Sequence, residues 1–189
     1  MKYKLTDETK ESLGRTLHRI VCLTAFASVS VGEVGGWVES ENNLSQEGNA
    51  WVYGNAKVYG DAKVYGDAKV SGDAKVYGNA KVYGNAKVYG DAKVYGNAKV
   101  YGNAEVSGDA WVSGDAKVEK SSDYAVYKNT WSSMRYFTWT RSNEKWSVGC
   151  FYGTGEELIT KAYKDSELSG KCYELVVNMR NELTKLEQA

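Results

Sequence analysis

Few residues of this chain could perform acid–base or nucleophilic chemistry. The 189 residues include one histidine, His18, and three cysteines. A Ser-His-Asp or Cys-His arrangement needs a base beside its nucleophile, and His18 is the one candidate of that type. It lies in a stretch that favours a strand, where a surface or end-covering role is the simpler interpretation. The sequence therefore predicts no catalytic residue, no metal ion and no cofactor, in a protein that is not an enzyme.

The other chemically suggestive residues point the same way. Cys22, Cys150 and Cys172 are odd in number and far apart, without metal-binding or redox spacing, so we expect reduced thiols in a cytosolic protein. The segment Gly153-Thr154-Gly155 precedes a predicted helix and could receive an anion at the helix N-terminus. It lacks the lysine of a phosphate loop and overlaps a capping box that starts at Thr154. We therefore expect helix capping there.

Charge and hydropathy narrow the possible partners. The chain carries 24 basic and 24 acidic residues, which removes the electrostatic argument for a nucleic-acid or membrane-surface partner. Residues 1–12 are strongly charged and do not form a signal peptide. The apolar stretch 20–31 is too short to span a bilayer. We expect a soluble protein of the cytoplasm.

The elements that must position any site are dominated by an internal repeat. From Gly48 to Glu119 the pattern Gly-Asn/Asp-Ala-x-Val-x occurs twelve times without interruption. Alanine and valine alternate with outward residues, and the Gly-Asn or Gly-Asp pair forms a turn. A strand this short cannot bury its apolar side unless copies stack. The repeats predict a mainly β fold with a parallel β-solenoid of about four triangular coils, each of 18 residues. A flattened coil of 12 residues is the alternative.

A coil of this size places the outward side chains in columns. One column consists of Tyr65, Tyr83 and Tyr101, and its neighbour of Lys63, Lys81, Lys99 and Lys117. Stacked tyrosine rings gain about 0.5–1.5 kcal/mol per pair, whereas stacked lysines repel one another. Two interpretations stay open. The columns could bind an acidic or phosphate-bearing partner, or the lysines could protect an exposed sheet from aggregation.

The unit Val52-Tyr53-Gly54-Asn55-Ala56-Lys57 and those after it resemble the hexapeptide-repeat family, in which a small residue follows an aliphatic one after four positions. The resemblance implies a left-handed solenoid, although the general crossover rule favours the right hand. It also makes a trimer worth testing. Enzymes of that family are acyltransferases with a histidine base or carbonic anhydrase-like proteins with three zinc-binding histidines. A single histidine excludes the zinc site, and an acyltransferase would need His18 to reach a cleft shared with a neighbour.

Residues 1–47 are predicted to form an N-terminal β cap with an irregular first rung. Two strands, 2–5 and 16–23, are joined by a polar loop. Trp37-Val38-Glu39 and Leu44 then form the first rung, which a two-residue insertion separates from the regular ones. Such a module could cover the open end of the solenoid, which would otherwise recruit further chains.

Residues 120–189 are predicted to form a β-hairpin and two helices. The strands are 124–127, 135–140 and the returning 146–152, and their candidate binding residues are Tyr136, Trp139 and Trp146. The helices run from about 154 to 164 and from about 167 to 186. The second carries a coiled-coil-like seam at Cys172, Val176, Met179, Leu183 and Leu186. This seam could pack on the hairpin or join copies into a dimer or trimer.

Several stretches outside and within the repeats resemble proteins encoded by bacteriophages and prophages. They include Tyr3-Lys4-Leu5-Thr6-Asp7-Glu8, Gly35-Gly36-Trp37-Val38-Glu39, the repeats, and Gly155-Glu156-Glu157-Leu158. The resemblance covers nearly the full chain. It implies a viral or prophage origin and a place in the cytoplasm of a bacterial host, and it brings no settled activity.

Three functions from different classes follow. The first is a non-enzymatic binding protein of phage origin that contacts a bacterial host protein or complex stoichiometrically, such as an anti-CRISPR-like inhibitor of a defence system. The second is a virion component or assembly scaffold. The third is an acyltransferase-like enzyme. The lack of catalytic groups favours the first. Because the repeats depart so little from their pattern, we expect the function at the irregular ends of the chain.

Overall fold

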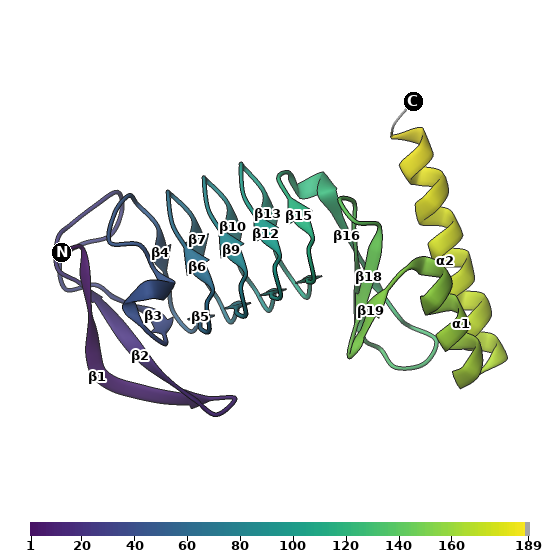
Figure 1. Cartoon of the computed structure of the whole chain (residues 1–189), viewed down its shortest axis with the longest axis horizontal. Coiled ribbons are helices and arrows are strands. Elements are labelled where there is room, and N and C mark those ends of the chain that lie inside the picture. Colours follow the sequence, from purple (N-terminus) through teal and green to yellow (C-terminus); the bar gives the residue numbers. More distant parts are fainter. Residues whose placement is uncertain (188–189) are drawn as a thin grey trace.

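The computed structural model describes residues 1–187 and contains a parallel β-solenoid between two end modules (Figure 1). The solenoid strands are β4 (Trp51–Val52), β5 (Lys57–Val58), β6 (Lys63–Val64), β7 (Lys69–Val70), β8 (Lys75–Val76), β9 (Lys81–Val82), β10 (Lys87–Val88), β11 (Lys93–Val94), β12 (Lys99–Val100), β13 (Glu105–Val106), β14 (Trp111–Val112) and β15 (Lys117–Val118). They build three faces, so the predicted fold class is confirmed.

The pairing register fixes the size of the coil. Lys57 pairs with Lys75, and Lys63 with Lys81, so each strand lies beside the strand 18 residues later. The triangular coil is therefore confirmed and the 12-residue alternative is wrong. Trp37 pairs with Lys57, and Leu44 forms a bridge to Val64, both 20 residues apart. The irregular first rung and its two-residue insertion are thus present, and the solenoid makes about five turns.

The core of the solenoid is a stack of alanine and valine side chains. Every repeat alanine from Ala50 to Ala116 and every repeat valine from Val52 to Val118 has no exposed surface. The glycines are needed for two reasons, as Gly72 illustrates. Its φ is +68°, and a Cβ atom there would lie 2.9 Å from the backbone nitrogen of Gly90 in the next coil. Coils stack this closely because both positions lack a side chain.

The N-terminal module is an antiparallel extension of one face. β1 (Tyr3–Ser12), β2 (Arg15–Cys22) and β3 (Val34–Val38) continue into β5, giving a seven-stranded sheet. The predicted polar loop is wrong, because residues 6–12 belong to β1 and the turn lies at Leu13 and Gly14. Alternating charged residues there pair with β2 across a long hairpin. The module packs aromatic rings on Trp51, with centroid distances of 6.0 Å for Tyr3 and 5.5 Å for Phe26.

The C-terminal module contains more strands than predicted. Its elements are η2 (Ser121–Asp123), β16 (Tyr124–Lys128), β17 (Tyr136–Thr140), β18 (Lys145–Val148), β19 (Phe151–Gly153), α1 (Gly155–Asp165) and α2 (Glu167–Leu186). The returning strand is broken at Gly149, whose φ is +56°, so a four-stranded antiparallel sheet replaces the hairpin. Both helices lie where expected, and the capping box of Thr154 and Glu157 is present. This part of the chain was predicted to run to residue 189, and residues 188–189 lie outside the described residues.

The two ends of the solenoid receive opposite kinds of hydrogen-bonding groups. Between coils, the N–H of one coil donates to the carbonyl of the next, as from Lys63 to Ala80 at 2.9 Å. The first coil therefore needs donors and the last coil needs acceptors. Lys2 Nζ donates to the carbonyl of Ala50 at 2.9 Å, and Asn43 Nδ2, from η1 (Glu41–Asn43), donates to that of Ala62 at 2.9 Å.

At the other end, hydroxyl oxygens accept. The N–H of Trp111 donates to Thr138 Oγ1 at 2.9 Å, and the N–H of Lys117 donates to Ser142 Oγ at 2.7 Å. Both end modules thus cover exposed backbone of the solenoid with side chains of the required polarity. No helix within residues 1–187 is both long enough and apolar enough to cross a membrane.

Candidate binding site

The residues that could do chemistry lie far from any catalytic arrangement. His18 is on β2, with its ring Nδ1 3.3 Å from the carbonyl oxygen of Thr6 in the same hairpin. Cys22 is buried, Cys150 is exposed and Cys172 is half-buried, and all three are free thiols. Among residues 1–187, no group of three or more His, Cys, Asp or Glu side chains is placed to hold a metal ion.

The tyrosine and lysine columns of the sequence analysis exist as geometric features. The rings of Tyr65, Tyr83 and Tyr101 stack with centroid distances of 4.9 and 5.2 Å and interplanar angles of 2° and 7°. Lys63, Lys81 and Lys99 occupy one adjoining face on β6, β9 and β12. Burial raises the pKa of Tyr65. A second column, Tyr59, Tyr77 and Tyr95, stacks in the same way at 5.1 and 5.0 Å.

Two of the three aromatic candidates in the C-terminal module are core residues. Trp139 is 2% exposed and Trp146 is 1% exposed, so neither can contact a partner in this conformation. They pack with Phe137 and Tyr173 beneath the helices. Strands β17 and β18 turn these side chains inward, which aromatic content alone does not reveal. Tyr136, in contrast, remains 37% exposed.

The predicted helix seam faces solvent instead of the sheet. α2 packs through buried Ser169, Gly170, Tyr173, Val177 and Arg180. Met179, Leu183 and Leu186 are 46%, 39% and 73% exposed, so the interpretation that this seam packs on the hairpin is wrong for them. Val176 alone of the four committed seam residues packs partly against the sheet core.

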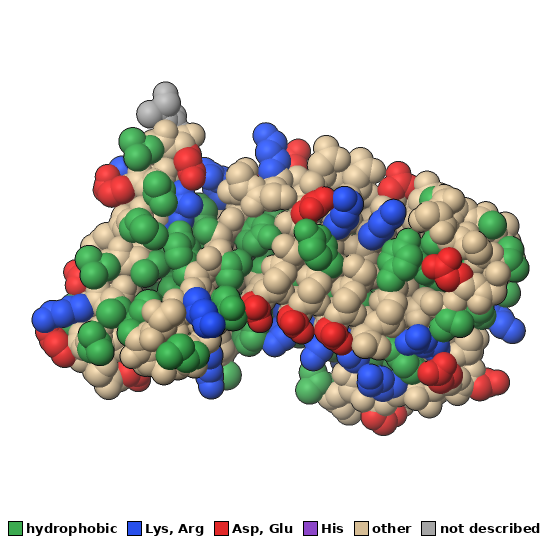
Figure 2. All heavy atoms as spheres, turned by 180° about the vertical axis from the view of Figure 1, so that it is seen from behind, with side chains coloured by type: hydrophobic (Ala, Val, Ile, Leu, Met, Phe, Trp, Pro, Cys, Tyr) green, Lys and Arg blue, Asp and Glu red, His purple; other side chains and the backbone are tan. Residues whose placement is uncertain are grey.

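Two further leucines, Leu168 and Leu175, lengthen this exposed face. We define the α2 stripe as Leu168, Cys172, Leu175, Met179, Leu183 and Leu186. Its members are spaced by three or four positions, so they share one side of a helix about 30 Å long. Together they present roughly 500 Å² of apolar surface, which is at the size that usually marks an interaction surface. Apolar side chains are visible along the C-terminal helices at the left of Figure 2.

A second feature, absent from the sequence analysis, is a pair of neighbouring hollows beside the last coil. One of about 480 Å³ is lined by Asp109, Trp111, Arg135, Tyr136, Gly149 and Cys150. The other, about 300 Å³, lies between the sheet and the helices and shares Arg135 and Cys150 with the first. Lys93 Nζ lies 3.8 Å from the ring centre of Trp111 at the solenoid side. Trp111 interrupts the repeat, and that departure was the one sequence signal for this place.

Fold and surfaces together define a parallel β-solenoid protein built of hexapeptide-like repeats, with its candidate contact residues concentrated after the last coil. Known proteins support this class. A family model described as YdcK Beta solenoid repeat matches residues 98–114. The chain is also similar to a protein named Uncharacterized acetyltransferase YdcK from Escherichia coli (strain K12), with 34% identity over 61 residues. That similarity covers 27% of this chain and 18% of the relative.

Proposed function

We propose that this protein is a non-catalytic binding protein that contacts a bacterial host protein stoichiometrically through the α2 stripe. The observation that carries the proposal is the exposed row of leucines on a helix whose opposite side is firmly packed. Leu175 is 71% exposed and Leu186 is 73% exposed, while Tyr173 and Val177 on the inner side are buried. Leaving so many large apolar side chains in water is costly, and a partner would remove that cost.

The spacing of the stripe indicates how a partner would be recognised. Apolar residues at intervals of three and four are the anchors that a helix presents to an apolar groove. The helix is held in place by contacts that require no movement on binding. The guanidinium of Arg180 lies 4.7 Å from the ring centre of Trp139 and 2.8 Å from Glu187. A pre-ordered helix loses little conformational freedom when it docks.

The identity of the partner is proposed on the resemblance to phage and prophage proteins. Small non-enzymatic proteins of that origin act on host macromolecules by occupying a surface, and a defence complex is the partner class we propose. The solenoid then serves as a rigid support, because its twelve repeats leave few local irregularities from which a site could be built. Nucleic acid and membrane surfaces remain outside this proposal, since the chain has no net charge.

A paired-variant pull-down tests the proposal. Leu175→Glu/Met179→Glu places two charges in the stripe, and Asn178→Glu/Asn181→Glu places two charges on the same helix outside it. Both variants should keep the wild-type circular dichroism spectrum. We expect wild type and the Asn variant to recover the same host protein in equimolar amount from bacterial lysate, and the Leu/Met variant to lose it. Equal recovery by both variants would refute the stripe as the contact surface.

Self-association is an alternative occupant of the same stripe, and light scattering distinguishes it. A wild-type dimer or trimer that becomes monomeric with Leu175→Glu/Met179→Glu, without any captured host protein, would replace the proposal. Recovery of the protein from purified virions would instead favour the structural role.

One observation favours an enzyme as a second candidate, namely the name of the E. coli relative as an acetyltransferase. In this chain an acyltransferase would depend on His18, the single histidine, which lies on the N-terminal hairpin. Titration with acetyl-coenzyme A tests this candidate. Saturable binding, and acyl transfer that disappears in His18→Ala, would support it over the binding protein.

A further inference from the structure

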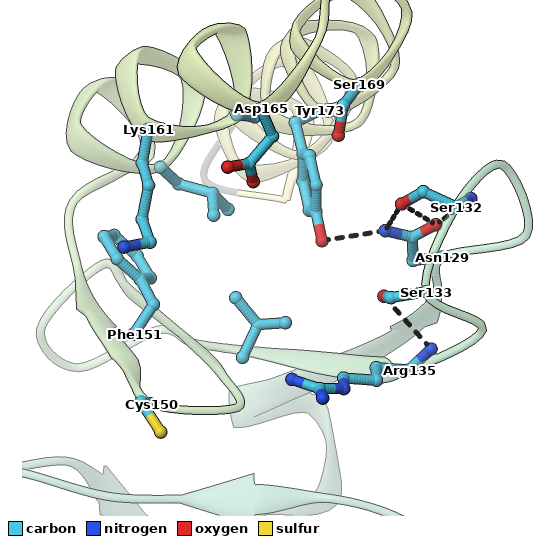
Figure 3. A pocket seen from close by; sticks show the side chains of 13 residues that line it. Asn129, Ser132, Ser133, Arg135, Cys150, Phe151, Lys161, Asp165, Ser169 and Tyr173 are labelled. Carbon is cyan, nitrogen blue, oxygen red and sulfur yellow. Dashed lines mark hydrogen bonds between the residues drawn. The ribbon is translucent and has the colours of Figure 1, made fainter.

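The smaller hollow is shaped as a pocket rather than as a surface depression. Its volume is about 300 Å³, and Figure 3 shows side chains from β17, from the turn before β19 and from both helices around it. Val148, Leu158 and Ala162 supply an apolar part of the lining. Pockets that hold small molecules combine such an apolar wall with a few polar groups.

Charged groups of both signs stand at the mouth of this pocket. Arg135 and Lys161 contribute positive charge, and Asp165 contributes negative charge. In Figure 3 the guanidinium of Arg135 and the carboxylate of Asp165 point into the hollow from opposite walls. Within residues 1–187, none of the three takes part in a salt bridge, although seven such bridges occur elsewhere. Their charges are thus available to a ligand.

A buried hydroxyl lies deeper in the same pocket. Tyr173 is 6% exposed, and its oxygen accepts a hydrogen bond from Asn129 Nδ2 at 3.1 Å. Asn129 is itself fixed, since its Oδ1 accepts from the N–H of Ser132 at 2.9 Å. The hydroxyl hydrogen of Tyr173 has no acceptor among the described residues. An unmet donor this far from water is costly unless a ligand or solvent molecule accepts it.

The electrostatics of Tyr173 agree with this geometry. Burial raises the pKa of Tyr173, and the nearby carboxylate of Asp165 raises it further, while Arg135 lowers it. The phenol therefore stays protonated and able to donate. Both charged residues act on the same hydroxyl, which places them close to it.

We propose that this pocket binds a small zwitterion of the α-amino acid type. Arg135 and Lys161 pair with its carboxylate, the Tyr173 hydroxyl donates to the same carboxylate, and Asp165 pairs with its ammonium group. A plain anion would meet repulsion from Asp165, and a plain cation would meet Arg135 and Lys161, so a ligand with both charges fits best. The side chain of the amino acid then lies against Val148 and Leu158. The proposal is independent of the α2 stripe.

Calorimetric titration of the full chain with each standard L-amino acid tests the ligand class. We expect saturable binding of at least one of them. The N-acetyl derivative of that amino acid lacks the ammonium group and its amide lacks the carboxylate, and each should bind at least about tenfold more weakly. Equal binding of the N-acetyl derivative would show a plain anion site and overturn the proposal, as would the absence of binding by the whole set.

Variants test the roles of the residues with the same amino acid. Asp165→Asn and Arg135→Gln should each weaken binding by about tenfold or more, because each removes a charged hydrogen bond. Asp165→Asn should do so without affecting the amide–N-acetyl difference that Arg135 controls. Lys161→Gln should weaken binding, whereas Lys164→Gln, on the same helix but outside the pocket, should not. Equal effects of the two lysine variants, in proteins with unchanged unfolding midpoints, would contradict the assignment.

Discussion

At the scale of single residues, polar side chains at the ends of the solenoid matter as much as the repeat itself. Lys2 is 7% exposed, and its ammonium reaches the carbonyls of Glu47, Gly48 and Ala50 at 3.4, 3.4 and 2.9 Å. Burial lowers the pKa of Lys2 to about 8, so the ammonium loses hydration that these carbonyls replace. No repeat pattern reveals such a residue, because it belongs to the flank and acts on backbone atoms.

Replacing this side chain should therefore destabilise the protein. Lys2→Met removes the donor from the three carbonyls, and we expect the free energy of unfolding to fall by about 1–2 kcal/mol. Lys4→Met, two positions along on the exposed side of β1, should change it by less than about 0.5 kcal/mol. Urea denaturation followed by circular dichroism measures both. If Lys4→Met costs as much as Lys2→Met, the capping role of Lys2 is wrong.

At the scale of elements, periodic segments were predictable and aperiodic ones were only partly so. The repeat fixes which residues face inward, so the columns of Tyr65 and Lys63 follow once the 18-residue coil is known. Helix bounds followed from the capping box of Thr154. The packed face of α2 did not, since it uses Gly170 and an Arg180 side chain stacked on Trp139, which hydrophobic spacing does not reveal. The paired hollows were missed because Arg135 and Asp165 meet only through tertiary packing.

The tyrosine columns give the protein a defined response to alkaline pH. Burial, with help from Tyr95 and Tyr59, raises the pKa of Tyr77 to about 12. An unfolded tyrosine ionises near pH 10, so above that pH the unfolded chain loses its proton first. This contribution to stability is complete below about pH 10 and is lost as the pH rises toward 12.

Urea denaturation at a series of pH values measures this loss. We expect wild-type stability to fall between about pH 10 and 12, and the fall to be smaller in Tyr77→Phe, which has no phenol to ionise. Tyrosinate absorbance of the urea-unfolded chain is the control, with a midpoint near that of free tyrosine. A stability that stays flat or rises across this range would disprove the argument.

At the scale of the whole molecule, the end modules make an open-ended stack into a closed unit. The N-terminal module supplies donors from Lys2 and Asn43, and the C-terminal module supplies acceptors from Thr138 and Ser142. The need for covering was predictable from the repeat. Its division into a donor end and an acceptor end required the direction of the ladder, which only the structure gives.

Removal of one end module should therefore promote association. A chain ending at Glu119 leaves the N–H groups of the last coil without their hydroxyl acceptors and exposes the edge of the stack. We expect its apparent mass in light scattering to rise with protein concentration, while the full chain keeps a constant mass. A truncated chain whose mass does not depend on concentration would show that the last coil needs no cover.

The 18-residue coil also makes the solenoid a spacer of fixed phase. Adding or deleting one whole coil would move the C-terminal module by about 4.8 Å along the axis while preserving its orientation toward the N-terminal hairpin. Adding a single hexapeptide would instead turn that module by about a third of a revolution, because each hexapeptide forms one of the three faces. Related chains that must engage the same pair of surfaces can therefore differ in length by coils but not by single hexapeptides. The near-identity of the repeats makes such changes easy to acquire.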